Sequence, residues 1–443
     1  MKAKLAALLI ALSSESIAAD FADSGVKVSF DEAFELAWKE APSLQIARHR
    51  VDGADAQRQI GRATLLPQVS LFGQWSENEL SYHGNTAFQD VSYPGERYGV
   101  QVRQALLNMP NLSEFRRLNV LYERSEDELR VVEIELFSVL LEDFLEILLA
   151  EATLNHLSTE YDALIEQQMQ ATALYEKKLL PVTQLLETQS RVESLAADII
   201  DAKGNLAIAK EGLAQLVGDR GLEPLPATES IVLLSRFAST ADVVEAALTN
   251  NPSLAVAESS LEAAQRAVDR EKGKWAPNVD VSYVYQQSDV GFDNLSSPKR
   301  DTSSVSIEVS YPLFEGGAGS ARLRSAKVDL RVAQTDLQAQ RSAIEASART
   351  AWVKFEATTE RVVAAKNLIR TVETNTEAAK KALQAGTGRV SDVLIALAQN
   401  TRAERDLTAA KFQYVMSWVL LELAAGTQPE VIVPRLSFAL HGS

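Results

Sequence analysis

The chain contains two copies of one sequence unit. A constant offset of 210 residues aligns residues 30–75 with residues 240–285 without a gap. The identical residues in this alignment include Pro42-Ser43-Leu44 with Pro252-Ser253-Leu254, Ala47 with Ala257, Ala54 with Ala264, and Pro67 with Pro277. Later in each copy the offset becomes 207 and then 208, pairing Val100 with Ile307, Val182 with Val390, and Gly218 with Gly426. Each half therefore has the same parts in the same order, and the fold must contain one architecture twice.

Each half includes one very long segment without glycine or proline. The segments run between Pro110 and Pro181 and between Gly319 and Gly386, and they are rich in the helix formers Ala, Leu, Glu, Gln and Arg. We expect helices at about 112–177 and 319–385, each roughly 100 Å long at 1.5 Å per residue. Because their apolar stripe is narrow, the sequence predicts coiled-coil partners rather than a compact globular domain.

A shorter helix is expected after each long one. The turns Lys178-Leu179-Leu180-Pro181 and Ala385-Gly386-Thr387-Gly388 contain helix breakers, and the helices expected after them span 182–217 and 389–425. Each half is thus predicted to form a long helical hairpin. A third helix is expected before the strands of each half, at about 43–66 and 253–275.

A β-hairpin is expected between the helices of each half, at about 67–107 and 277–314. Val279, Val281 and Tyr283 alternate there with Asn278, Asp280 and Ser282. Alternation over about ten residues is typical of membrane β-barrel strands, although a half-buried soluble sheet has the same pattern. Four strands cannot close a barrel, and lipid does not tolerate an open sheet edge. A barrel would therefore be shared between chains, and three copies would supply twelve strands.

The N-terminus is typical of a secretory signal peptide, which we assign to residues 1–19. Two lysines near Met1 precede a short apolar run and then small residues up to Ala19. A helix of a cytoplasmic protein is the alternative. The chain has no cysteine, so a lipid-anchored cysteine and disulfides are not expected. After this segment the sequence has no run of 18 apolar residues, and a membrane crossing would have to use strands.

Charge and composition argue against several classes of function. The formal net charge of −16 disfavours nucleic acid as a partner. The four histidines, at 49, 83, 156 and 441, are scattered and do not have metal-ligand spacing. We therefore expect no enzyme activity, no metal and no cofactor, and we interpret His156 as a helix-surface residue.

Two motifs carry a resemblance to a known family. Tyr311-Pro312-Leu313-Phe314-Glu315-Gly316-Gly317 ends the fourth predicted strand, and Gly386-Thr387 is followed by Asp392-Val393-Leu394 at a helical turn. With the duplicated order of helix, hairpin, long helix and short helix, the chain resembles the TolC family of outer-membrane factors over nearly its whole mature length. Residues 383–426 are the most specific part of the resemblance.

The resemblance implies a mainly α-helical fold with a membrane β-barrel portion. It implies a homotrimer whose twelve-stranded barrel contacts the lipid of the cell outer membrane and whose coiled-coil tunnel extends into the periplasm. The repeats would be residues 20–218 and 240–426, and the linker 219–239 and the tail 427–443 would form an equatorial belt. The implied partners are a periplasmic adaptor protein and an inner-membrane pump, either an ABC transporter or a proton-driven pump.

The resemblance also implies rings of acidic side chains that narrow the tunnel at its periplasmic tip. Asp392 matches the first family position, but Ile395 occupies the second. Glu187 is equivalent to Ile395 at the offset of 208, so we expect a selectivity ring of Asp392 with Glu187, which would favour cations. The alternative is that both are solvated helix-surface acids, which are common near helix N-termini.

The tip departs from the family pattern in its first turn. Lys178 and Gln184 stand where the family usually has a glycine and a later acid, so this tip is more basic than usual. Four tip residues match the family's small and apolar residues, and they are our candidates for docking of the adaptor: Leu179, Leu180, Gly386 and Thr387.

Three functions remain open at this point. The chain is expected to be a passive exit duct, and the missing lipid anchor favours type I protein secretion. Efflux of drugs or other small molecules is the alternative. A periplasmic coiled-coil structural protein is a distant third, since it accounts for the helices but not for the signal peptide or the hairpins.

Overall fold

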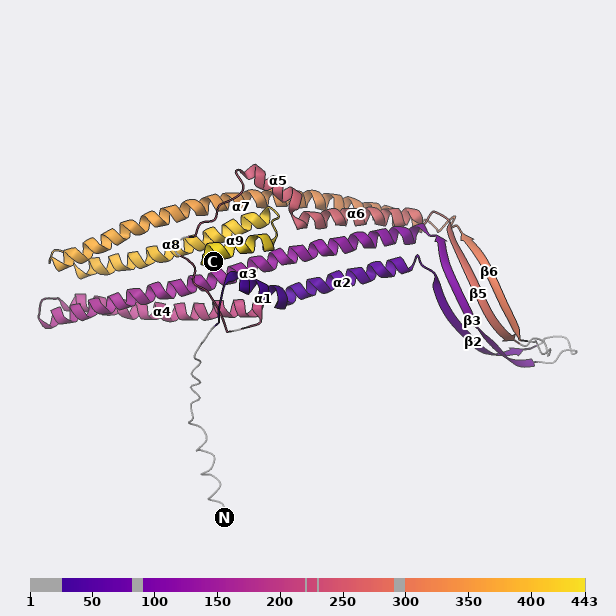
Figure 1. Ribbon diagram of the computed structural model, residues 1–443, viewed down its shortest axis with the longest axis horizontal. Helices are drawn as coiled ribbons and strands as arrows, with labels where there is room; N and C mark the ends of the chain where they lie inside the picture. The colour runs from indigo at the N-terminus through magenta and orange to yellow at the C-terminus, as the bar shows by residue number, and fades with distance from the viewer. Residues whose placement is uncertain (1–25, 82–90, 220, 229–230, 291–298, 443) are drawn as a thin grey trace, which may run out of the picture.

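The computed structural model describes residues 26–81, 91–219, 221–228, 231–290 and 299–442. The predicted signal peptide, residues 1–19, lies outside the described residues, as does His83. The described chain is elongated, with a long bundle of helices that has a sheet at one end and helical turns at the other (Figure 1). Each repeat contributes one helical hairpin and one β-hairpin to this arrangement.

The two longest helices determine the length of the molecule. Helix α3 spans Met109–Glu176 with 68 residues, and α7 spans Ala318–Gln384 with 67. Each is antiparallel to the helix that follows it, α4 at Val182–Val217 and α8 at Val390–Ala424 (Figure 1). At 1.5 Å per residue the long helices are roughly 100 Å in length. Among the described helices, none has a stretch sufficiently long and apolar to traverse a lipid bilayer.

Shorter helices line the end of the bundle nearest the sheet. Helices α2 (Pro42–Ala63) and α6 (Pro252–Gly273) lead into the strands, and each follows a short helix, α1 (Phe30–Glu40) or α5 (Thr240–Asn250). The prolines at 42 and 252 occupy the first helical position, where a missing N–H leaves no hydrogen bond unmade. Helix α6 packs against both α3 and α7 and therefore connects the two repeats.

The sheet has four long antiparallel strands in the order β2-β3-β5-β6. They are β2 (Gln68–Leu80), β3 (Val91–Leu107), β5 (Asn278–Val290) and β6 (Arg300–Ser310). Pairing of β3 with β5 joins the two repeats, and β2 and β6 form the edges of the sheet. Val305, Ile307 and Val309 on β6 are 63–72% exposed, so an apolar face lies uncovered in the single chain.

The core lies midway along the bundle, where both ends of the described chain pack against the long helices. Phe30 on α1 makes edge-to-face contacts with Phe137 and Phe144 on α3, with ring centroids 5.8 and 5.3 Å apart. The tail forms helix α9 (Pro429–His441), and β1 (Val26–Val28) pairs in parallel with β4 (Leu222–Pro224). These three elements were not predicted from the sequence.

A buried carboxylate connects the linker and the tail to α8 in this central region. The Glu422 side chain is 1% exposed, and its two oxygens lie 3.1 Å from Nε of Arg236 and 3.2 Å from Nη1 of Arg435. Oε2 of Glu422 also accepts a hydrogen bond of 2.9 Å from the Thr427 hydroxyl. Because a buried charge is tolerated only when it is paired, this contact holds residues from three segments in one arrangement.

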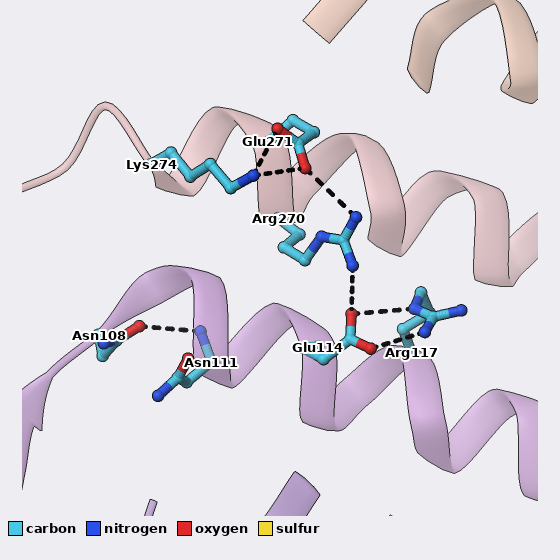
Figure 2. Close-up of polar contacts among 7 residues, drawn as sticks. All are labelled: Asn108, Asn111, Glu114, Arg117, Arg270, Glu271 and Lys274. Atoms are coloured by element: carbon cyan, nitrogen blue, oxygen red, sulfur yellow. Dashed lines mark hydrogen bonds and ion pairs between the residues drawn. The ribbon is translucent and has the colours of Figure 1, made fainter. Parts of the chain in front are cut away.

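A second charged cluster, the junction cluster, lies where the helices meet the strands (Figure 2). It consists of Glu114 and Arg117 on α3 with Arg270, Glu271 and Lys274 at the end of α6. Glu114 accepts hydrogen bonds from Arg117, at 2.6 and 2.9 Å, and from Nη1 of Arg270 at 2.9 Å. The Arg117 guanidinium, with Arg270 adding to its effect, holds the pKa of Glu114 below its ordinary value. The cluster therefore joins the first repeat to the second through charge-assisted bonds.

The remaining bonds of the junction cluster keep the end of α6 in place. Lys274 donates to both carboxylate oxygens of Glu271 at 2.9 Å, and Arg270 donates to Glu271 at 3.3 Å. Nearby, the Asn108 side chain accepts the Asn111 N–H at 2.9 Å and caps α3 (Figure 2). A Cβ at Gly273 would lie 3.1 Å from the Met109 backbone, so the two helix ends approach closely.

We expect Arg270→Ala to lower the free energy of unfolding by about 1–3 kcal/mol, because it leaves two partly buried carboxylates without a shared cation. Arg266→Ala is the matched control. Its side chain is equally exposed, at 35%, but its ion pair with Glu262 lies within α6 and should contribute at most about 0.5 kcal/mol. Thermal unfolding of the detergent-purified protein measures both effects, and equal losses would contradict a role in joining the repeats.

Candidate functional site at the helical tips

Each helical hairpin has a turn that joins its two helices, and both turns lie at the same end of the molecule, opposite the sheet (Figure 1). The first turn, between α3 and α4, spans residues 177–181, and the second, between α7 and α8, spans residues 385–389. All the site residues expected from the sequence lie in these turns or within the first two turns of the helices that follow them.

The first turn contains a lysine in the left-handed backbone region. Lys178 has φ of 57°, and every other described residue with positive φ is a glycine. This conformation costs a residue with a side chain roughly 1–2 kcal/mol relative to ordinary helical backbone. The Lys178 N–H donates to the Tyr175 carbonyl at 2.8 Å, and the Leu179 N–H donates to Leu174 at 2.9 Å, which closes the end of α3.

The second turn closes α7 with the same backbone bond but uses a glycine. Gly386, which is equivalent to Lys178 at the offset of 208, has φ of 74°. The Thr387 N–H donates to the Ala382 carbonyl at 3.0 Å, the counterpart of the bond from Leu179 to Leu174. The family-like glycine in the second turn thus occupies a position that favours it, whereas the lysine in the first turn is strained.

The four candidate docking residues differ in their exposure. Leu179 is 70% exposed, and Gly386 and Thr387 are exposed as well. Leu180 is half-buried instead, because it packs against a core cluster that includes Leu157 and Val390. Three of the four are therefore accessible to a partner in the single chain, and Leu180 mainly supports the turn.

Asp392 and Glu187 are both exposed but lie in different surroundings. The Asp392 carboxylate accepts the Arg389 N–H at 3.1 Å, so it caps the start of α8. Glu187 lines a groove of about 550 Å³ between α4 and α8, and Ile395 is among the other lining residues. Asp392 is not among them. The repeat-equivalent positions 187 and 395 therefore share one groove.

A contact between the two helical hairpins was missed in the sequence. His156 on α3 is half-buried, and its Nδ1 lies 3.1 Å from the Glu404 carboxylate on α8. The Asn400 side chain donates to the same carboxylate at 2.8 Å. The interpretation of His156 as a helix-surface residue gives it no partner, and no local signal in the sequence reveals one in the other repeat. Within the described ranges, no group of three or more His, Cys, Asp or Glu is arranged to hold a metal ion.

Comparison with known proteins gives consistent matches. A family model described as outer membrane efflux protein matches residues 33–219 and 243–427. The alkaline protease secretion protein AprF of Pseudomonas aeruginosa is 24% identical over 90% of this chain and 84% of its own length. Outer membrane protein TolC of Escherichia coli is 20% identical over 99% of this chain and 89% of its own. The solved structure of VceC, the outer membrane protein of Vibrio cholerae, covers 90% of this chain and 96% of its own, with 18% identity and a TM-score of 0.80. The duplicated, mainly α-helical fold class expected from the sequence is confirmed.

We expect Gly386→Ala to destabilise the second turn by about 1 kcal/mol, because alanine does not favour a positive φ. Gly204→Ala, in the middle of α4, should stabilise its helix by about 0.5–1 kcal/mol. An added Cβ meets no atom within 4 Å at either position, so the backbone alone accounts for the difference. Hydrogen exchange of the Thr387 N–H should become faster in the first variant only, and an unchanged rate would contradict this account.

Proposed function

The chain belongs to the outer membrane efflux protein family, and on that premise we propose that it is the exit duct of a tripartite system for type I protein secretion. The family comprises channels of the cell outer membrane whose helical part extends into the periplasm. Such a channel is passive and provides a path rather than a reaction. In the proposed system a periplasmic adaptor would connect it to an inner-membrane pump, either an ABC transporter or a proton-driven pump.

The observation that carries the proposal is the relation to AprF, a protein named for secretion of an alkaline protease, which extends over 90% of this chain. It supports a protein as the cargo. Efflux of small molecules is the second candidate, and the description of the family as efflux proteins favours it. The periplasmic structural protein that we considered from the sequence does not fit a family of the outer membrane.

We further propose a homotrimer. The edge strands β2 and β6 have no neighbour beyond them within the described sheet, and β6 carries exposed apolar side chains. In lipid both edges must be paired, and pairing β6 of one copy with β2 of the next would repeat the contact of β3 with β5. Three copies would then give a twelve-stranded barrel, in the range of bacterial barrels.

The proposed domain division follows the two repeats. The tail contains α9, which lies midway along the helices (Figure 1), and the linker contains β4, whose Leu222 belongs to the same core cluster as Ile432 of α9. This placement supports an equatorial belt formed by residues 219–239 and 427–443. The buried Glu422, with its partners Arg236 and Arg435, would hold the belt to the tunnel wall.

At the tip we propose that Asp392 and Glu187 make the tunnel entrance selective for cations. Both carboxylates are exposed in the single chain, and they belong to the helices that begin at the tip. Three to six carboxylates at close quarters in a trimer would attract cations and repel anions. The cap that Asp392 provides to α8 does not require its charge, so the two roles can be separated by substitution.

Deletion of the gene is expected to abolish secretion of one or more extracellular proteins and to leave drug sensitivity nearly unchanged. The measurement compares proteins in the culture medium and growth inhibition by drugs in the deletion strain, with a strain carrying the wild-type gene on a plasmid as the control. Unchanged secretion with increased drug sensitivity would favour efflux. Migration of the membrane fraction with and without heating tests the trimer in the same strains.

Asp392→Ala is expected to lower the ratio of cation to anion permeability of single channels by about twofold or more, because it removes one charge from each copy at the entrance. Asp392→Asn keeps an oxygen that can accept the Arg389 N–H, and it should have the same effect if the charge is responsible. Asp406→Ala, at an exposed acid further along α8, is the matched control. Reversal potentials in a salt gradient measure the ratio. An unaltered value in both Asp392 variants would remove this residue from the site.

A further inference from the structure

The first turn, between α3 and α4, contains a residue whose backbone conformation is unfavourable for its residue type. Lys178 is the single described residue other than glycine with a positive φ, and its equivalent in the second repeat is Gly386. Both turns close their helix with the same backbone hydrogen bond, from Leu179 to Leu174 and from Thr387 to Ala382. The second turn therefore forms the same backbone hydrogen bond without a lysine, so the bond does not require one. Strain that the local fold does not require points to a role for the side chain.

The charge of the first turn also distinguishes the two repeats. Lys177 and Lys178 are both exposed, and their equivalents in the second repeat are the uncharged Ala385 and Gly386. Within the described part of the chain, neither ammonium group has an ion-pair partner. Leu179, directly after them, is 70% exposed. Two cations and an apolar side chain thus project from one turn of a chain whose net charge is −16.

We propose that Lys177 and Lys178 form a cationic docking point for acidic side chains of the periplasmic adaptor. The proposal rests on the proposed function, because it needs a tripartite system. The turn lies at the end of the molecule opposite the sheet, at the far end of helices roughly 100 Å long, so lipid around the strands cannot reach it (Figure 1). A second copy meeting tip to tip would bring like charges together.

The consequence is a distinction between two docking positions. At the second turn Gly386 lets a partner approach the backbone closely, whereas at the first turn the lysines offer point charges. Complementary charge at the rim of an interface mainly determines association rate and orientation. An acidic segment of the adaptor would therefore bind at the first turn rather than at the second. The charges determine the register of the assembly.

The test replaces the chromosomal gene with variants and measures export of the cargo identified by the gene deletion. The double variant K177E/K178E should reduce export about tenfold, because it turns attraction into repulsion. Lys178→Arg keeps the charge and should export within about twofold of the wild type. Lys203→Glu, the same kind of substitution made once at an exposed site on α4, is the control for a reversed charge away from the turn and should also stay within about twofold.

A further variant separates charge from backbone strain. Lys178→Gly relieves the positive φ and removes one cation, so the turn becomes more favourable while docking becomes weaker. Export should fall about threefold in this variant, as expected from one lost rim charge. Wild-type export with Lys178→Gly, or with K177E/K178E, would overturn the proposal. Each variant must show the migration and single-channel conductance of the wild type, so that loss of export reflects docking and not folding.

Suppressor selection identifies the partner directly. Cells carrying K177E/K178E are selected for restored export, and their genomes are sequenced. The proposal expects substitutions of Asp or Glu by neutral or basic residues in a periplasmic adaptor. Suppressors confined to the cargo, or to the channel chain itself, would assign the lysines to another partner and overturn it. If deletion of the whole gene does not affect export, the proposed function fails instead, independently of the lysine variants.

Discussion

The hydrogen-bonded ladder between β3 and β5 is the contact on which the arrangement of the two repeats depends. A Cβ at Gly99 would lie 2.3 Å from the Tyr285 carbonyl oxygen, so the two strands meet more closely there than any side chain allows. Since β3 runs directly into α3 and α6 leads into β5, the ladder brings α3 and α6 side by side. The ion pair of Glu114 with Arg270 then holds these helices where they leave the sheet. The contacts at the sheet end therefore determine where the helical hairpins lie. The tips lie at the far ends of the long helices, roughly 100 Å from the sheet.

Much of the fold class could be predicted because glycine and proline are few and clustered in this chain. Glycine and proline mark the turns, and the long intervals between them allow little except helix. The central region could not be predicted in the same way. Helix α9 contains Pro434 within its span, and it is held by packing of residues such as Ile432 and Leu436 against the core. The buried Glu422 looks like any surface acid in the sequence, since Arg236 and Arg435 come near it only after folding.

The candidate site shows the same limit on a smaller scale. Gly386 could be identified as a turn residue from its type alone, and the structure gives it a positive φ. Lys178 also has a positive φ, but its residue type does not indicate this, because lysine does not favour that conformation; only its place at the family's usual glycine position hints at it. The pairing of His156 with Glu404 is a contact between repeats, and neither residue stands in a pattern that indicates the other. Sequence periodicity therefore finds the elements, and contacts between distant elements need the structure.

The tips of the two repeats have the same backbone arrangement but carry their charged residues at different positions. At the offset of 208, Lys178 corresponds to Gly386, Gln184 to Asp392, and Glu187 to Ile395. Each charged residue at the tip therefore has an uncharged counterpart in the other repeat. If three copies close into a ring, the backbones of the six turns are related by near-sixfold symmetry, whereas the pattern of charges has only threefold symmetry. A partner that binds by shape alone would find six similar positions, and a partner that carries an acidic group would find three. The duplication thus supplies the scaffold of the tip, and the differences between its copies supply the means to recognise one turn from the other.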